Sequence, residues 1–193
     1  MEIFLKLLKW VFSSKQAPAA QESPPPPVVQ PELVPAAETP KPGPAPLTRA
    51  DLLKGRDKQY AADFTQEISD NLDKLLIILN KLQAAYGKRL PISSGWRPPA
   101  VNEATSNAAK KSNHLKGLAV DIADADGDFM RWCLSNLELM KELGVWFEDF
   151  RWTPTWTHCQ IVPPGSGRRV YVPSTAPAPA PTRWAGTYDQ KFD

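Results

Sequence analysis

The segment SNHLKGLAVDI, residues 112–122, places a histidine and an aspartate on either side of a glycine turn. Residues 118–122 are apolar except for Asp121, a pattern that predicts a buried strand. A carboxylate inside an apolar strand needs a partner, because burying a bare charge is costly. His114 lies seven positions before Asp121, an odd spacing that would put the two side chains on opposite faces of one continuous strand. A turn at Gly117 breaks that continuity and allows the two side chains to meet.

The second histidine, His158, lies in the segment WTHCQ, residues 156–160. Period-two alternation puts His158 and Gln160 on one face and directs Cys159 into the core. The chain has only these two histidines. Together with Asp121 they supply the ligand types of a catalytic zinc site, which keeps its fourth position for water. The same histidines are equally compatible with a role in packing.

The elements around these segments predict one α+β domain. Thr48 and Gly55 bound a short helix, and an apolar stripe that ends at Gly87 marks a long one. Two consecutive prolines, Pro98 and Pro99, argue against a helix at that point. The predicted helices are residues 48–54, 65–86 and 128–143, and the predicted strands are residues 90–93, 118–122, 145–152 and 156–162, the last two joined as a hairpin. This order favours a small antiparallel sheet packed against helices.

Proline marks the domain boundaries. The chain has 193 residues and 21 prolines, of which 11 lie in residues 16–47 and four more between residues 173 and 181. We therefore expect a domain at residues 48–172, a disordered proline-rich linker at 16–47 and a proline-rich tail with an aromatic end at 173–193. The linker would act as a stiff spacer with a reach on the order of 100 Å.

Residues 1–15 predict a short amphipathic helix. No apolar run there exceeds three residues, which is too short for a transmembrane helix or a secretory signal. Residues 3–12 would contact a membrane surface or a protein partner, or else pack on the domain itself.

The charge balance restricts the partners. The formal net charge is +2 and no basic block exceeds a pair of residues, so a nucleic acid is not expected to bind. Two cysteines, Cys133 and Cys159, make neither a disulfide framework nor a four-thiolate metal site, and they leave the redox compartment open.

Three segments resemble the motifs of one protein family in their order and spacing. They are SSGWR at 93–97, SNH with its following Gly and Asp, and WTH at 156–158. They are similar to the zinc D-alanyl-D-alanine carboxypeptidases and L-alanyl-D-glutamate endopeptidases of bacteria and phages, a group that shares its fold with lysostaphin-type peptidases and the hedgehog domain. The resemblance covers roughly residues 91–162. It implies one zinc ion held by His114, Asp121 and His158, with Arg97 directed at a substrate carbonyl or carboxylate and Ser112 hydrogen-bonded to the substrate. Gln160 or Asn113 would orient the imidazoles.

The sequence departs from the family where a general base is expected. Family members carry an acid or a histidine a few residues before the last metal histidine, whereas residues 152–157 here contain neither. The nearest carboxylates are Glu148 and Asp149, which alternate in direction so that only one can face the metal. We favour Glu148 for its longer side chain, and the alternative is that both are solvated charges.

These observations predict a zinc peptidase that cleaves an amide bond in the peptide stem of bacterial peptidoglycan. The site of action would be the bacterial cell envelope. A phage lysis or virion protein fits this expectation, and bacterial and phage origin are both left open. A second hypothesis is a weakly active or inactive murein-binding module of a phage particle, and a weaker third is a proline-rich adaptor. Carboxypeptidase and endopeptidase are not distinguished, because both classes share the same metal ligands.

Overall fold

The computed structural model describes residues 43–153 and 155–173. The predicted helix at 1–15, most of the linker at 16–47 and nearly all of the tail at 173–193 lie outside the described residues. In the described part, helices and strands form an α+β fold around one five-stranded sheet. The predicted fold class is therefore confirmed at this level.

The sheet is mixed and its strand order is β1-β2-β4-β3-β5. The pairs β1·β2, β2·β4 and β3·β4 are antiparallel, whereas β3·β5 is parallel. The prediction of a purely antiparallel sheet is thus wrong at one edge. The edge strand there, β5, has two residues and is too short to show alternation in the sequence. The strands are β1 (Ile92–Ser94), β2 (Ala119–Ala123), β3 (Trp146–Glu148), β4 (Trp156–Gln160) and β5 (Val170–Tyr171).

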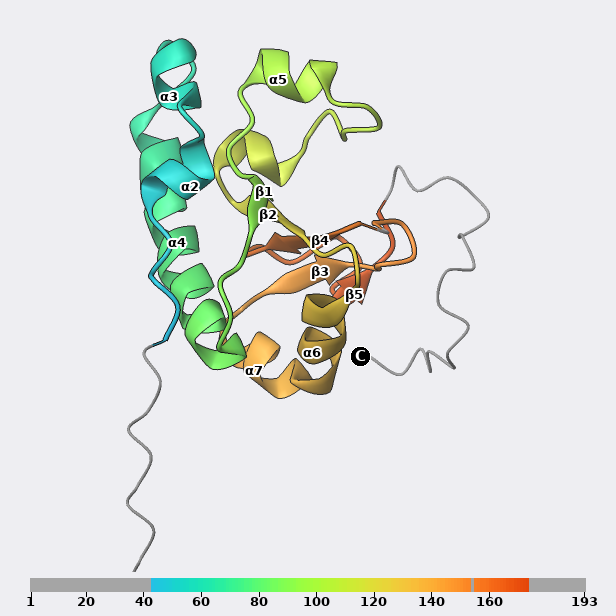
Figure 1. The fold of residues 1–193 in the computed structure, drawn as a ribbon. Helices are drawn as coiled ribbons and strands as arrows, with labels where there is room; N and C mark the ends of the chain where they lie inside the picture. Colours follow the sequence, from blue (N-terminus) through green and yellow to red (C-terminus); the bar gives the residue numbers. More distant parts are fainter. Residues whose placement is uncertain (1–42, 154, 174–193) are drawn as a thin grey trace, which may run out of the picture. The chain divides into compact units, whose positions relative to one another are not determined.

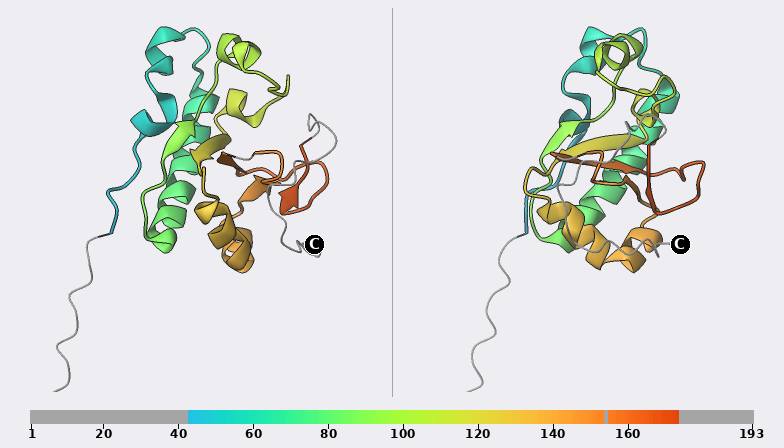
Figure 2. Two further views of the ribbon diagram at one scale, coloured as in Figure 1. Left: turned by 45° about the vertical axis from the view of Figure 1, so that its right-hand side comes forward. Right: turned by 90° about the vertical axis from the view of Figure 1, so that its right-hand side faces the viewer.

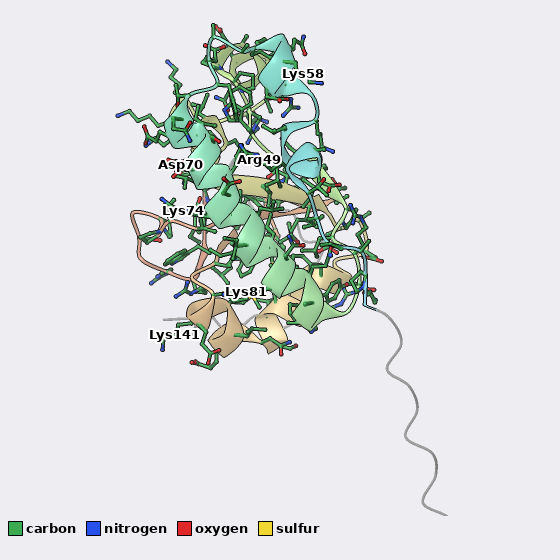
Figure 3. All side chains as sticks on the ribbon, turned by 90° about the vertical axis from the view of Figure 1, so that its left-hand side faces the viewer. Arg49, Lys58, Asp70, Lys74, Lys81 and Lys141 are labelled. Carbon is green, nitrogen blue, oxygen red and sulfur yellow. The ribbon has the colours of Figure 1, made fainter. Side chains whose placement is uncertain are left out.

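Six α-helices and one 3-10 helix, η1, are found in the described residues. They are α2 (Arg49–Leu53), α3 (Arg56–Gln59), α4 (Gln66–Tyr86), α5 (Pro99–Ala104), η1 (Asn113–Lys116), α6 (Asp128–Ser135) and α7 (Leu137–Glu142). The long helix α4 begins and ends as predicted: the Thr65 hydroxyl accepts the Ile68 N–H, and Gly87 closes the helix at a φ of 74°. Its leucine stripe is buried, and Figure 3 shows Asp70, Lys74 and Lys81 on its outer face.

Two helix predictions need correction. The helix α5 begins at Pro99, where the missing N–H of proline is tolerated in the first turn. The helix predicted at 128–143 is broken at Asn136, which has a φ of −128° and separates α6 from α7. The Asn136 amide donates to the Trp132 carbonyl, so the side chain competes with the backbone for helical hydrogen bonds.

The helices surround the sheet on several sides. Figure 1 shows α4 along one side of the sheet, α6 and α7 at one end and α5 at the opposite end, and both views in Figure 2 keep these two ends apart. Leu72, Ile122 and Phe147 are fully buried in the shared core, as is Cys159, which points inward as predicted. None of the described helices has the length and hydropathy needed to cross a membrane.

Candidate metal centre

The register of the sheet places Asp121 beside His158. These residues are direct partners in the antiparallel pair β2·β4, so their side chains leave the same face of the sheet. The neighbouring positions of both strands, Val120 and Cys159, point into the core. The distance from His158 Nδ1 to Asp121 Oδ1 is 2.8 Å.

His114 reaches the same point from η1. The Ser112 hydroxyl caps this turn by accepting the His114 N–H, and Gly117 ends it at a φ of 68°. Residues 112–117 thus form the predicted break between the histidine and the strand. His114 Nε2 lies 3.2 Å from Asp121 Oδ1 and 3.3 Å from His158 Nδ1. The three predicted ligands therefore converge, with one ligand atom from each lying within 4.8 Å of the others.

A backbone carbonyl fixes the tautomer of His114. The Gly95 oxygen lies 2.7 Å from His114 Nδ1, and since a carbonyl only accepts, Nδ1 carries the proton. His114 is fully buried, and this burial lowers its pKa and keeps the ring neutral. His114 Nε2 is then left with a free lone pair, which is directed at Asp121 and His158.

The electrostatics of Asp121 favour its ionised form. Burial alone would raise its pKa, but the two adjacent imidazoles, with the hydrogen bond that His158 Nδ1 donates, outweigh burial and hold the pKa far below its usual range. For His158, burial opposes protonation, whereas the hydrogen bond to Asp121 and the nearby Glu148 raise its pKa overall. Asp121 is thus ionised, and its carboxylate lies beside the two imidazoles as a third candidate ligand for a metal ion.

This donor set fits a divalent metal. The unprotonated Nε2 of His114 faces a carboxylate oxygen at 3.2 Å with no proton between them, a repulsive contact that a cation would remove. Two imidazole nitrogens and one carboxylate oxygen are also the donor types of three-ligand catalytic zinc sites. Among the described residues, the group found with ligand atoms close enough to share a metal ion consists of His114, Asp121 and His158.

The three residues sit beside a cavity of about 720 Å³, a size typical of ligand sites. Asp121 and His158 line it, together with Arg97, Ser112 and Glu148. The structure therefore brings most of the predicted site residues to one place.

Arg97 is nine-tenths buried, and its Nη2 lies 3.9 Å from Asp121 Oδ2. Its Nε is buried and has no hydrogen-bond partner in the described part of the chain. Arg97 is anchored by its backbone N–H, which donates to the His114 carbonyl. The guanidinium is thus held next to the candidate ligands, where it lines the cavity.

The two candidate bases occupy different environments. Glu148 lines the cavity, and burial, together with the charge of Asp121, raises its pKa even though His158 and Arg97 oppose the shift. Asp149 is also buried, but both of its oxygens accept hydrogen bonds from the Arg151 guanidinium, at 2.9 and 3.0 Å from Nε. Asp149 is not among the described residues that line the cavity. Of the two, Glu148 alone lines the cavity together with the candidate ligands Asp121 and His158.

Two features of the site were missed at the level of sequence. The first is the hydrogen bond between the Gly95 carbonyl and His114. The available signal for it was the glycine itself, between Ser94 and Trp96. The second is Tyr171, which pairs with Glu148 in β3·β5 and lines the cavity. It escaped because β5 itself was not predicted.

Comparison with known proteins gives one match. The model of the family described as peptidase M15 matches residues 46–159, more than half of the chain, and includes all three candidate ligands. A search of curated proteins and a search of solved structures returned no match. The match confirms the family inferred from the motifs, without specifying a subgroup. The chain belongs to the peptidase M15 family.

Proposed function

We propose that this protein is a zinc-dependent peptidase that hydrolyses an amide bond in the peptide stem of bacterial peptidoglycan. The observation that carries the proposal is the convergence of His114, Asp121 and His158 beside a cavity that also presents Arg97 and Glu148. Membership of a peptidase family supports the reaction class. The peptidoglycan stem follows from the resemblance of the motifs.

His114, Asp121 and His158 would hold the metal ion. A bound zinc ion lowers the pKa of its water to about 7 and polarises a carbonyl oxygen. The Gly95 carbonyl keeps the His114 proton on Nδ1, so that Nε2 stays available as a ligand.

Glu148 is suited to move the proton. Burial is the largest cause of its raised pKa, so its carboxylate takes up a proton more readily than an exposed glutamate. We assign it the role of accepting the proton of the attacking water and of delivering it to the departing amine nitrogen.

Arg97 and Ser112 are suited to bind the substrate. The Arg97 guanidinium lines the cavity beside Asp121, so its fixed positive charge can stabilise negative charge on the substrate oxygen. Ser112 lines the same cavity, and its oxygen already accepts the His114 N–H, which leaves its hydroxyl proton to donate.

The test is hydrolysis of purified murein and of synthetic stem peptides, with mass spectrometry of the products. We expect a chelator to abolish release of peptides and added zinc to restore it. His114→Ala should remove both activity and zinc, whereas Lys116→Ala, an exposed change in the same turn, should remove neither.

The products also identify the bond that is cleaved: free D-alanine indicates a carboxypeptidase, and longer fragments an endopeptidase. A wild-type protein that binds murein peptides but releases nothing with zinc present would favour the binding-module hypothesis. A chelator-resistant activity, or an active His114→Ala protein, would refute the proposal.

A further inference from the structure

Gln160 is the centre of a partly buried hydrogen-bond network at the side of the candidate metal centre. Its side-chain oxygen accepts two hydrogen bonds, from Asn113 Nδ2 at 3.0 Å and from the Tyr171 hydroxyl at 2.7 Å. Its side-chain nitrogen donates to the Val162 carbonyl at 2.7 Å. Gln160 itself is only 4% exposed, whereas its three partners are partly buried, and Gln160, Asn113 and Tyr171 line the cavity.

The network joins the segments that carry the candidate metal ligands. Asn113 immediately precedes His114 in η1, and Gln160 follows His158 by two positions on the same face of β4. The bond between them spans 47 positions of sequence. It therefore connects the two histidine-bearing segments directly.

This arrangement corrects the expectation that Gln160 or Asn113 orients an imidazole. The partner of His114 Nδ1 is the Gly95 carbonyl, and Asn113 and Gln160 bond to each other. The effect of the pair on the imidazoles is thus indirect. It acts on the spacing of η1 and β4.

A second amide holds the other end of η1. Asn71 of α4 donates to the Lys116 carbonyl at 3.0 Å. The turn that carries His114 is thereby tied to α4 at its end and to β4 at its beginning. Only the bond at its beginning also reaches the strand that carries His158.

We propose that Gln160 is a positioning residue, which through Asn113 sets the separation of His114 and His158 and so tunes the affinity of the site for zinc. The inference rests on the proposed zinc function. A metal site must hold its ligands within about 0.5 Å of the productive geometry, which requires supporting hydrogen bonds. Hydrogen-bonding residues that support metal ligands in this way typically contribute about 10–100-fold to metal affinity.

The experiment measures zinc affinity without turnover, by equilibrium competition with a chromophoric chelator on the full chain. The variants are Gln160→Met, Asn113→Ala and the double substitution. We expect each single substitution to raise the zinc dissociation constant about tenfold or more. Because both remove the same bond, the double variant should be no more than about twofold weaker than Gln160→Met.

Gln83→Met is the matched control. Gln83 is 2% exposed, and its side chain makes two hydrogen bonds, donating to the Ala45 carbonyl and accepting the Leu90 N–H. It lies near the end of α4, whereas Asn71, which holds η1, lies near its beginning. Its loss should lower the melting temperature of the metal-free protein as Gln160→Met does, and leave zinc affinity unchanged.

The outcomes separate this inference from the proposed function. A wild-type protein without zinc affinity would overturn both. A wild-type protein that binds zinc, with Gln160→Met and Asn113→Ala variants that bind it equally well, would overturn the positioning role alone. Equal loss of zinc affinity in Gln160→Met and Gln83→Met would also overturn it, because the effect would then follow general destabilisation.

Discussion

Gly95→Ala tests how the chain supports the first histidine ligand. An ideal Cβ at Gly95 would lie 2.0 Å from the Leu52 oxygen and 2.7 Å from the Leu52 carbonyl carbon. The requirement for glycine is one of space, since α2 approaches the end of β1 at this point. Ordinary carbon to oxygen contacts are about 3.3 Å or longer, so the backbone must move by more than about 1 Å.

The displacement breaks two hydrogen bonds. One joins Trp96 N–H to the Leu52 carbonyl at 3.0 Å, and the other joins His114 Nδ1 to the Gly95 carbonyl at 2.7 Å. An unsatisfied buried polar group costs about 1–3 kcal/mol. We therefore expect the free energy of unfolding to fall by about 2–6 kcal/mol. The freed His114 ring should weaken zinc binding by about 10–100-fold.

Urea unfolding of the metal-free protein and zinc competition measure the two effects separately. Gly43→Ala is the control, because a Cβ there meets nothing within 4 Å, and it should change the unfolding free energy by less than about 0.5 kcal/mol. A Gly95→Ala protein with the stability and zinc affinity of the wild type would refute the reasoning.

Three other variants separate catalysis, substrate binding and stability. Glu148→Gln should retain zinc and lose about 10²–10⁴-fold in kcat on stem peptides. Asp149→Asn should keep the wild-type kcat and unfold more easily, since Asp149 pairs with Arg151. Equal losses of kcat in the two variants would argue against Glu148 as the base. Arg97→Lys should lower kcat/KM about 10²-fold at unchanged zinc affinity, because an ammonium cannot reproduce the guanidinium donors, and wild-type kinetics would exclude that role. Leu79→Ala should lower the unfolding free energy by about 2–5 kcal/mol in a urea titration, because Leu79 is 1% exposed, and a change below about 1 kcal/mol would contradict this.

The candidate ligands could be predicted because their local patterns are strong. Alternation set the face of His158, and the odd spacing between His114 and Asp121 required the turn that the structure has at η1. The limits of α4 were also available, since Thr65 and Gly87 are strong helix boundary residues.

Features that depend on tertiary contacts could not be predicted in this way. The strand β5 has two residues and forms only by pairing with β3. The break at Asn136 depends on a side-chain hydrogen bond to Trp132 that helix periodicity does not reveal. The Gln160 network spans 47 positions, so no local pattern marks it.

The sheet register also explains how a base can lie outside the segment before the last histidine. Asp121 pairs with His158 in β2·β4, and Phe147 pairs with Cys159 in β3·β4. Continuing the β3·β4 register by one residue would place Glu148 opposite His158. Opposite positions in an antiparallel pair have Cβ atoms about 4.5–5.5 Å apart, within reach of a glutamate side chain. The neighbouring strand thus supplies a carboxylate at the place where residues 152–157 supply none. A one-residue slip of β3 against β4 would exchange the faces of Glu148 and Asp149, so the proposed catalytic role depends on the same register that buries Phe147.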